Sequence, residues 1–196
     1  MVRLFVGLEL SQELKQSLQF ARGGVEGAHW QSDAQLHLTL AFIGEVPSSA
    51  VVQIEEALAD IHFDPFELAL EGVNMFGSTR QPKTLWAGVA NEAPLQHLHD
   101  KVQNALERVG METDRRRYKP HVTLARFPRS LHAKIGDWLT ANGVLRTPAQ
   151  PVGYFSLFSS QRSDEGPCYL VEARFGDGMT HDVNFEFVEC RELETL

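Results

Sequence analysis

His37-Leu-Thr-Leu-Ala-Phe42 recurs 84 residues later as His121-Val-Thr-Leu-Ala-Arg126, with His, Thr, Leu and Ala in the same places. An internal duplication is the simplest explanation of this match. Side chains alternate between the two faces of a β-strand, so each histidine shares a face with the threonine two residues later. The repeat therefore predicts two strands that seal a core on one face and present His and Thr to a cleft on the other.

The sequence around the repeat predicts further strands and helices. Expected strands lie at 2–8, 37–43, 66–71, 84–89, 121–127, 152–158 and 168–175. Gly44 is expected to end the second of these strands, and a turn-rich loop at 77–82 precedes the fourth. Apolar residues three or four apart predict helices whose first turns lie near Ser11, Val51, Pro94 and Ser130. The tail at 176–196 is acidic, and 183–188 is a candidate edge strand.

The order of these elements predicts the fold class. Strands and helices mix without the regular alternation of a parallel sheet, which favours an α+β fold with antiparallel sheets. No long linker or low-complexity segment divides the chain. We therefore expect residues 1–196 to form a single domain that contains both repeated segments, 37–40 and 121–124.

Composition indicates a protein of the cytoplasm. The 196 residues include no apolar run near the ~20 needed to cross a bilayer, and the opening apolar stretch ends too early for a signal peptide. We expect no membrane association and no obligate protein partner. Cys168 and Cys190 are too few for a disulfide framework and too far apart in sequence for a zinc or redox pair, so buried or idle thiols are expected.

The charge pattern limits the kind of nucleic-acid binding. A net charge of −8 argues against a protein that coats nucleic acid non-specifically, but it allows a small anionic substrate. Positive charge is concentrated around the second repeat, at Arg115, Arg116, Arg117, Lys119, Arg126 and Arg129. This cluster is either a solvated loop or a rim that attracts phosphate.

The paired residues suit cleavage of a cyclic phosphodiester. One imidazole would take a proton from the attacking water, and the other would protonate the departing ribose oxygen. Histidine can do either task near neutral pH because its ordinary pKa is about 6.5. The hydroxyls of Thr39 and Thr123 can donate hydrogen bonds to the non-bridging phosphate oxygens. The scheme requires no metal and no cofactor.

The other six histidines lack this context, and we expect them at the surface: His29, His62, His97, His99, His132 and His181. Two of them, His97 and His99, lie two apart on a predicted helix, whereas helical side chains that share a metal are three or four apart.

At these residues the sequence resembles the two-histidine (2H) phosphoesterase superfamily, and within it the RNA 2′,3′-cyclic phosphodiesterases, also called the LigT or 2′-5′ RNA ligase family. The similar segments begin at Arg3, Leu36, Thr84 and Lys119, and the likeness covers roughly residues 2–175. It implies a bilobal α+β fold, in which two pseudo-symmetric lobes with antiparallel sheets flank a central cleft and carry their helices outside.

The resemblance also implies a reaction and roles. The reaction is hydrolysis of an RNA 2′,3′-cyclic phosphate to a 2′-phosphate, with RNA or a nucleotide as substrate, His37 as proton donor and His121 as proton acceptor. Arg126 fits a family arginine that contacts phosphate, and Phe42 holds the equivalent place as a base-stacking candidate. Strict alternation puts both on the face opposite the histidines, so a bulge would have to turn them back. The alternatives are a rim arginine and a core phenylalanine.

Other functions compatible with the sequence are 2′-5′ joining of RNA ends, the reverse of a similar phosphoryl transfer, and nucleotide binding without turnover. The intact His and Thr residues of both repeats argue against the second. Metal-dependent hydrolysis lacks a convincing set of carboxylate and histidine ligands.

Overall fold

The computed structural model describes residues 1–112, 116–128, 133–163 and 166–176. Strands occupy β1 (Val2–Glu9), β2 (His29–Trp30), β3 (His37–Val46), β4 (Phe66–Leu68), β5 (Leu70–Gly77), β6 (Pro82–Val89), β7 (Val122–Arg126), β8 (Gln150–Val152), β9 (Phe155–Ser163) and β10 (Gly166–Phe175). Helices occupy α1 (Gln12–Gln19), α2 (Val51–Ala59), α3 (Ala93–Arg108) and α4 (Gly136–Asn142), with short 3-10 turns η1 (Asp33–Gln35) and η2 (Ser48–Ala50).

The main sheet is antiparallel and consists of two halves. Its strand order is β10-β9-β1-β3-β7-β6-β5, with β2 added beside β7, while β4 and β8 pair separately. Within one half, β1 and β3 pair along their whole length, from Val2↔Val46 to Glu9↔His37. Between the halves, β3 and β7 share one registered pair, Leu38↔Val122. The sheet is therefore joined at the two strands that carry the sequence repeat, which confirms the predicted α+β class with antiparallel pairing.

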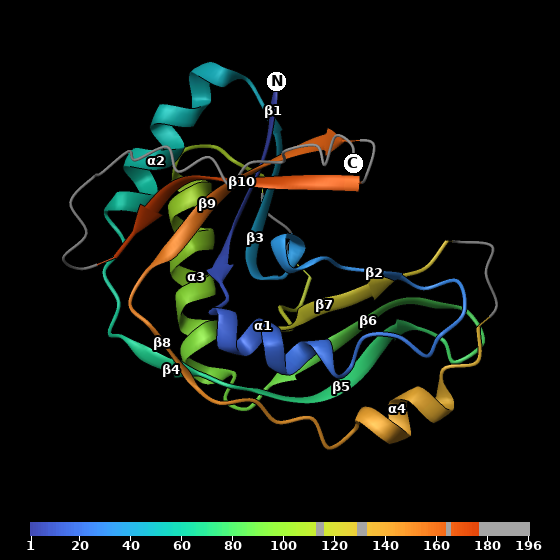
Figure 1. Ribbon diagram of the computed structural model, residues 1–196. Helices are drawn as coiled ribbons and strands as arrows, with labels where there is room; N and C mark the ends of the chain where they lie inside the picture. The colour runs from blue at the N-terminus through green and yellow to red at the C-terminus, as the bar shows by residue number, and fades with distance from the viewer. Residues whose placement is uncertain (113–115, 129–132, 164–165, 177–196) are drawn as a thin grey trace, which may run out of the picture.

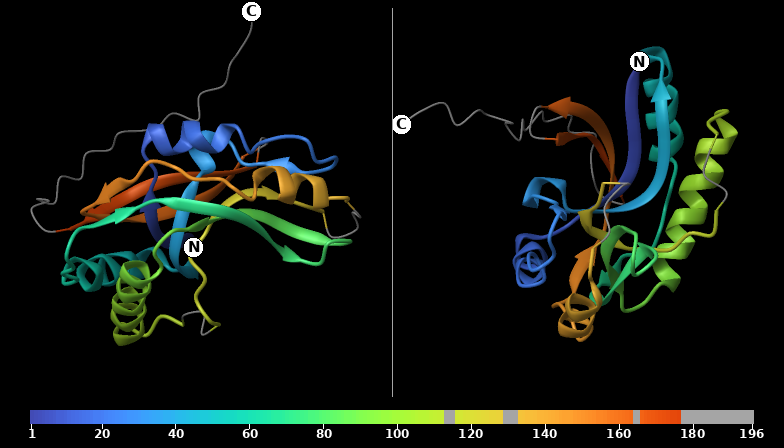
Figure 2. Two further views of the ribbon diagram at one scale, coloured as in Figure 1. Left: turned by 90° about the horizontal axis from the view of Figure 1, so that it is seen from below. Right: turned by 90° about the vertical axis from the view of Figure 1, so that its right-hand side faces the viewer.

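The helices lie on the outside of the two halves (Figures 1 and 2). Helix α3 packs against β3 and α2 packs against α3, whereas α4 packs against β5 in the other half. Trp138 on α4 donates a hydrogen bond from Nε1 to the carbonyl of Ala21, just after α1, at 3.0 Å. Each half thus carries its own helices, as expected for two lobes.

The apolar residues of the repeat form the centre of the core. Leu38, Leu40, Val122 and Leu124 are all at most 2% exposed, as predicted from strand alternation. The helices contribute their expected apolar stripes, and the largest comes from α3. Its buried members are Leu95, Leu98, Val102, Ala105 and Leu106.

Several predicted boundaries differ from the structure. Strand β3 continues past Gly44, which adopts a φ of +89° within the strand, because glycine tolerates this backbone conformation without ending the pairing. The strand predicted at 66–71 is divided at Ala69, where pairing changes from β8 to β6. Likewise the strand predicted at 152–158 is divided into β8 and β9 at Gly153 and Tyr154, where the pairing partner changes from β4 to β1.

Helix α4 begins at Gly136, and residues 133–135 before it are not helical. The expected start at Ser130 and the candidate edge strand at 183–188 lie outside the described residues. Cys168 is disulfide-bonded, which corrects the expectation of a buried or idle thiol at this position, and Cys190 lies outside the described residues. Among the described residues, no helix is long and apolar enough to cross a membrane.

Candidate active site

The four repeated polar side chains lie on one face of the sheet, where its halves meet. Leu38 pairs with Val122 in antiparallel register. The positions beside this pair put His37 opposite Thr123, and Thr39 opposite His121. The residues between them point into the core, and all four polar side chains are half-buried. The two copies therefore build one site with approximate two-fold symmetry.

A β-bulge in β3 changes the direction of the side chains after Thr39. Two consecutive residues of β1 pair with Thr39 and Ala41, so Leu40 is an extra residue in the ladder. Leu40 and Ala41 are consequently both buried. The bulge returns Phe42 to the face of Thr39, where it is 54% exposed.

The second copy contains the same bulge. Consecutive residues of β6 pair with Thr123 and Ala125, which leaves Leu124 as the extra residue, and both Leu124 and Ala125 are fully buried. Arg126 thereby returns to the face of Thr123 and is exposed. The resemblance to the family implied a bulge that turns Arg126 toward the histidines. Strand β7 contains this bulge, and β3 contains the matching one before Phe42.

Each histidine ring is oriented by the backbone carbonyl two residues before it. His37 Nδ1 lies 2.8 Å from the oxygen of Gln35, and His121 Nδ1 lies 2.7 Å from the oxygen of Lys119. A carbonyl can only accept a hydrogen bond, so each Nδ1 carries a hydrogen and donates it. Nε2 is then the atom of each ring that gains or loses a proton.

Aromatic side chains form the walls around the two imidazoles. The ring of His37 lies 4.8 Å from that of Phe5 and meets Tyr169 edge-on at 5.0 Å, between centroids. The ring of His121 meets Phe76 edge-on at 5.0 Å and lies 5.7 Å from Trp86. Sequence reasoning missed these walls. Alternation along β1 and β6 is the signal that could have indicated Phe5 and Trp86, whereas Tyr169 comes from a distant strand.

The electrostatics of the site favour neutral imidazoles. Burial, the largest cause, and the nearby charges of Arg126 and His121 lower the pKa of His37 from about 6.5 to about 4. Burial and the charges of Arg126 and Lys119 also lower the pKa of His121. The carbonyl bonds to Gln35 and Lys119 oppose these shifts. Arg126 therefore lowers the pKa of both histidines, although it belongs to the same copy of the repeat as His121 alone.

The lowered pKa of His37 predicts a pH dependence of stability. Between pH ~6.5 and ~4 the unfolded chain protonates this histidine while the folded chain does not, so stability falls as the pH falls through that window. We expect His37→Gln to reduce this loss by about 1–3 kcal/mol. Urea unfolding at pH 7 and pH 4 measures it, with the exposed His97→Gln as control. Parallel pH curves for wild type and His37→Gln would contradict the shift.

A cavity of about 390 Å³ adjoins His37 and not His121. Phe158, Tyr169 and Arg174 line it from strands β9 and β10, and Lys15 lines it from α1. The two tetrads, residues 37–40 and 121–124, are nearly symmetric, but this cavity makes their surroundings different.

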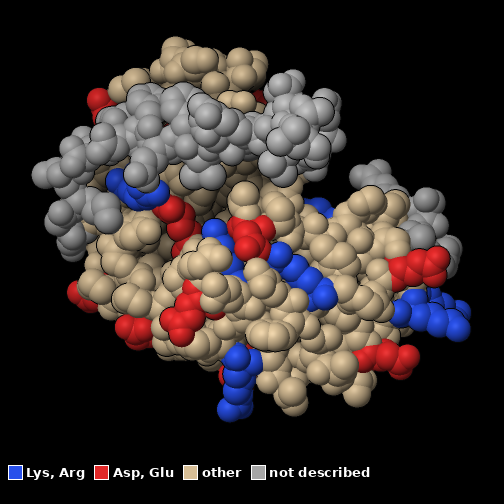
Figure 3. Space-filling view, viewed as in Figure 1, with Lys and Arg blue, Asp and Glu red and all other residues tan. Residues whose placement is uncertain are grey.

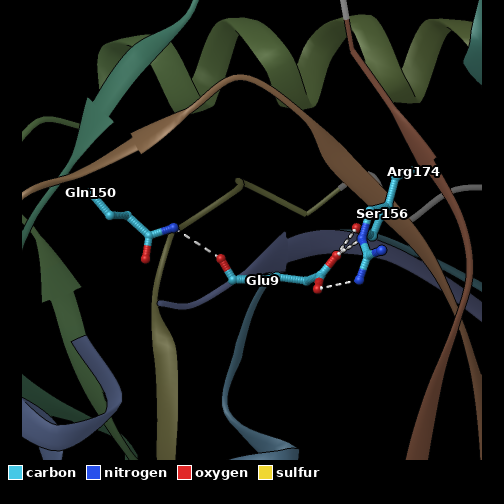
Figure 4. Close-up of polar contacts among 4 residues, drawn as sticks. All are labelled: Glu9, Gln150, Ser156 and Arg174. Atoms are coloured by element: carbon cyan, nitrogen blue, oxygen red, sulfur yellow. Dashed lines mark hydrogen bonds and ion pairs between the residues drawn. The ribbon is translucent and has the colours of Figure 1, made fainter. Parts of the chain in front are cut away.

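Glu9, the cross-strand partner of His37, also lines this cavity and is held by several side chains (Figure 4). Arg174 donates to both carboxylate oxygens of Glu9, at 2.7 and 3.0 Å, and the Ser156 hydroxyl donates at 2.6 Å. Gln150 donates to the Glu9 backbone oxygen at 3.0 Å. Burial alone would raise the pKa of Glu9, but Arg174 and Ser156 hold it below its ordinary value. This network ties β1, β8, β9 and β10 together beside the site.

Two described members of the predicted basic cluster, Lys119 and Arg126, bear on the site. Lys119 places Nζ 4.8 Å from the centre of the Trp86 ring, and Arg126 acts on both histidines. Arg115 and Arg129 lie outside the described residues. On the face shown in Figure 3, Lys and Arg side chains are interspersed with Asp and Glu. Within the described part of the chain, the positive charges that lower the pKa of His121 are those of Arg126 and Lys119.

One of the six remaining histidines contradicts the expectation of surface positions. His99 is 8% exposed, because α3 turns it inward toward β3. His29, His62 and His97 are exposed, whereas His132 and His181 lie outside the described residues. Within the described ranges, no three or more His, Cys, Asp or Glu side chains are grouped as metal ligands.

Residues 9–149 match the family model described as the 2′-5′ RNA ligase superfamily. The chain belongs to this superfamily. A protein of Archaeoglobus fulgidus named RNA 2′,3′-cyclic phosphodiesterase is 29% identical, over 86% of this chain and 96% of the relative. One of the same name from Aeropyrum pernix is 34% identical, over 70% of this chain and 79% of the relative.

Solved structures of similar fold agree with the superfamily assignment. The crystal structure of TT0787 of Thermus thermophilus has a TM-score of 0.74 and 26% identity, and the match covers 89% of this chain and 97% of that one. The likeness of fold to this structure thus extends over most of the chain.

Proposed function

We propose that this protein hydrolyses RNA 2′,3′-cyclic phosphate ends to 2′-phosphate ends by two-histidine acid–base catalysis without a metal. The observation that carries the proposal is the symmetric placement of His37, Thr39, His121 and Thr123 on one face, with both Nδ1 atoms bound to carbonyls. The superfamily membership and the names of the relatives support the same reaction. We also infer that residues 1–196 form one domain, since each half supplies one tetrad.

The proposed reaction needs two proton transfers and one displacement at phosphorus. The neutral Nε2 of His121 takes a proton from water as its oxygen bonds to phosphorus. The bond from phosphorus to the ribose 3′ oxygen breaks on the opposite side, and His37 supplies a proton from Nε2 to that oxygen. The phosphate remains on the 2′ oxygen. Proton exchange with solvent restores both imidazoles.

Thr39, Thr123 and Arg126 are the proposed phosphate contacts. The two hydroxyls lie opposite the two histidines, so they can donate to non-bridging oxygens while the imidazoles act on the entering and leaving oxygens. Arg126 adds positive charge at the same face, where charge on the phosphate must be stabilised through the transition state. This arrangement uses every polar residue of the repeat.

The cavity supports His37 as the acid. The leaving 3′ oxygen belongs to the ribose, so the terminal nucleoside lies on the side of the histidine that protonates this oxygen. Water enters from the opposite side. The cavity adjoins His37, and its Phe158 and Tyr169 side chains offer surfaces for a nucleoside. Phe42, exposed on the same face, is a second proposed base-stacking residue.

The lowered pKa values keep both histidines neutral in the empty site, as the base requires. The acid must be protonated, which it becomes only after the substrate binds. His37 must carry a proton before it can donate one, yet its pKa in the empty site is about 4. The phosphodiester brings a negative charge beside both rings, which favours their protonated forms and raises both pKa values. We therefore expect the pH optimum of kcat to lie above that of kcat/KM.

The reaction is tested with an RNA oligonucleotide that bears a 2′,3′-cyclic phosphate. We expect a 2′-phosphate product, identified by phosphorus NMR, and a rate that changes less than about twofold in EDTA, because the histidines perform both proton transfers. An oligonucleotide with a 3′-phosphate serves as the control. A 3′-phosphate product would contradict the proposed direction of cleavage. Loss of turnover in EDTA that zinc or manganese restores would contradict the mechanism.

A further inference from the structure

The bulge of β3 is held by two side chains that the proposed reaction does not use. The Tyr118 hydroxyl donates to the backbone oxygen of Thr39 at 3.1 Å, and His99 Nδ1 lies 2.8 Å from the backbone oxygen of Leu40. The Tyr118 and His99 rings stack with centroids 4.0 Å apart and planes 3° from parallel. One stacked pair therefore contacts the two consecutive carbonyls at the bulge, beside the catalytic face.

The corresponding place in the second tetrad is held differently. There the oxygen of Leu124 accepts a hydrogen bond from the backbone N–H of Gln31 at 2.9 Å, beside the short pairing of β2 with β7. A backbone group thus holds the second bulge, whereas side chains from α3 and from the approach to β7 hold the first. The two tetrads are alike in their catalytic groups and unlike in their support.

Tyr118 also connects the two tetrads. It lies three residues before His121, and Lys119, the next residue, accepts the Nδ1 hydrogen of that histidine. The same short segment therefore binds the backbone of Thr39 through Tyr118 and orients His121 through Lys119. A displacement of this segment would move a group in each half of the site.

We propose that His99 and Tyr118 are positioning residues that hold the first tetrad in register with the second. They act through the backbone of the bulge, which places Thr39 before it and Phe42 after it on the same face, toward the cleft. His99 is 8% exposed and reaches the bulge from α3, so the pair also couples this helix to the site.

The chemistry of the pair suits a fixed support. A backbone carbonyl accepts only, so His99 donates through Nδ1. Burial, and to a smaller extent Glu92, raise the pKa of Tyr118 above its ordinary value, so its hydroxyl keeps the hydrogen that it donates. The support is therefore present over the pH range in which the two catalytic histidines titrate. The kinetic test of this role rests on the proposed hydrolysis.

Tyr118→Phe removes one hydroxyl and retains the stacked ring. We expect kcat on the cyclic phosphate substrate to fall about tenfold, because small displacements of catalytic groups are costly, while KM changes less than about twofold. Thr140→Val on α4 also removes a hydroxyl that donates to a backbone carbonyl, that of Gly136 at 3.0 Å, and should retain wild-type kcat. Equal kcat values for wild type and Tyr118→Phe would overturn the proposal, as would a raised KM with unchanged kcat.

Variants of His99 test the same positioning role if Tyr118→Phe does not fold. In His99→Asn the side-chain N–H₂ can replace the Nδ1 donor, whereas His99→Leu has no donor. We expect His99→Asn to keep several-fold more kcat than His99→Leu, with His97→Leu on the exposed side of the same helix as control. Identical kcat in the two His99 variants would show that the donor does not position the site.

A measurement without turnover separates this proposal from the proposed reaction. Nitrogen-15 NMR of the imidazoles reports how the His37 and His121 rings are held. In Tyr118→Phe we expect both sets of resonances to shift, and in Thr140→Val neither. Unmoved resonances would overturn the positioning role. Wild-type protein that leaves the cyclic phosphate intact would overturn the proposed function alone.

Discussion

His37→Ala and His121→Ala are each expected to lower the rate of cyclic phosphate hydrolysis by about 10²–10⁴-fold, because each removes one of the two proton transfers. The fold should survive, since both rings are half-buried at the cleft and the adjoining core residues are unchanged. Single-turnover rates measure the loss, and circular dichroism checks the fold. His62→Ala, which changes an exposed histidine, is the control.

A better leaving group distinguishes the two variants. A substrate in which a more acidic alcohol replaces the 3′ oxygen needs less help from a general acid, so it should restore the variant that lacks the acid. We expect rescue of His37→Ala, because the cavity proposed for the nucleoside adjoins His37. Rescue of His121→Ala would reverse the assigned roles. Near-normal rates in both variants with the ordinary substrate would contradict two-histidine catalysis.

The sequence repeat contained most of the information about the shape of the site. Identical spacing of His and Thr predicts two cleft-facing pairs, and the alternating leucines predict which face is buried. The structure adds the register Leu38↔Val122, which sets each histidine opposite the threonine of the other copy. Register between strands 84 residues apart depends on the whole fold, so a local pattern cannot supply it.

The bulges show where local rules stop. Simple alternation puts Arg126 and Phe42 on the wrong face, and the pairs Leu40-Ala41 and Leu124-Ala125 reveal the exception only through their shared burial. Two consecutive apolar residues after each Thr are compatible with a bulge, but an ordinary strand can also contain them. The likeness to the family pointed to Arg126 where periodicity did not.

Nothing in the sequence surroundings of His99 distinguishes it from a surface histidine. Its position follows from the packing of α3 against β3, and its function from the bulge carbonyl that it meets. The aromatic walls were equally hard to predict, since Tyr169 and Phe158 contact His37 but come from strands far from either tetrad in sequence. Sequence reasoning therefore identified the repeated groups better than the residues that support them.

Arg126→Gln is expected to lower kcat/KM by roughly ten- to a hundredfold, because it removes the proposed charged contact to the phosphate. It should also shift the pH profile. The charge of Arg126 lowers the pKa values of both His37 and His121, so its removal makes both easier to protonate. Both limbs of the bell-shaped kcat/KM profile should then move to higher pH, although neither limb belongs to one histidine alone.

Arg126→Lys separates the two effects of the arginine. Lysine keeps the positive charge but lacks the planar fork that binds two phosphate oxygens at once. We therefore expect a lower kcat/KM with a pH profile close to that of wild type. Arg146→Gln, an exposed arginine paired with Glu71, should change neither quantity. A wild-type pH profile in Arg126→Gln would show that this charge does not tune the histidines, whereas unchanged kcat/KM would remove Arg126 from the phosphate site.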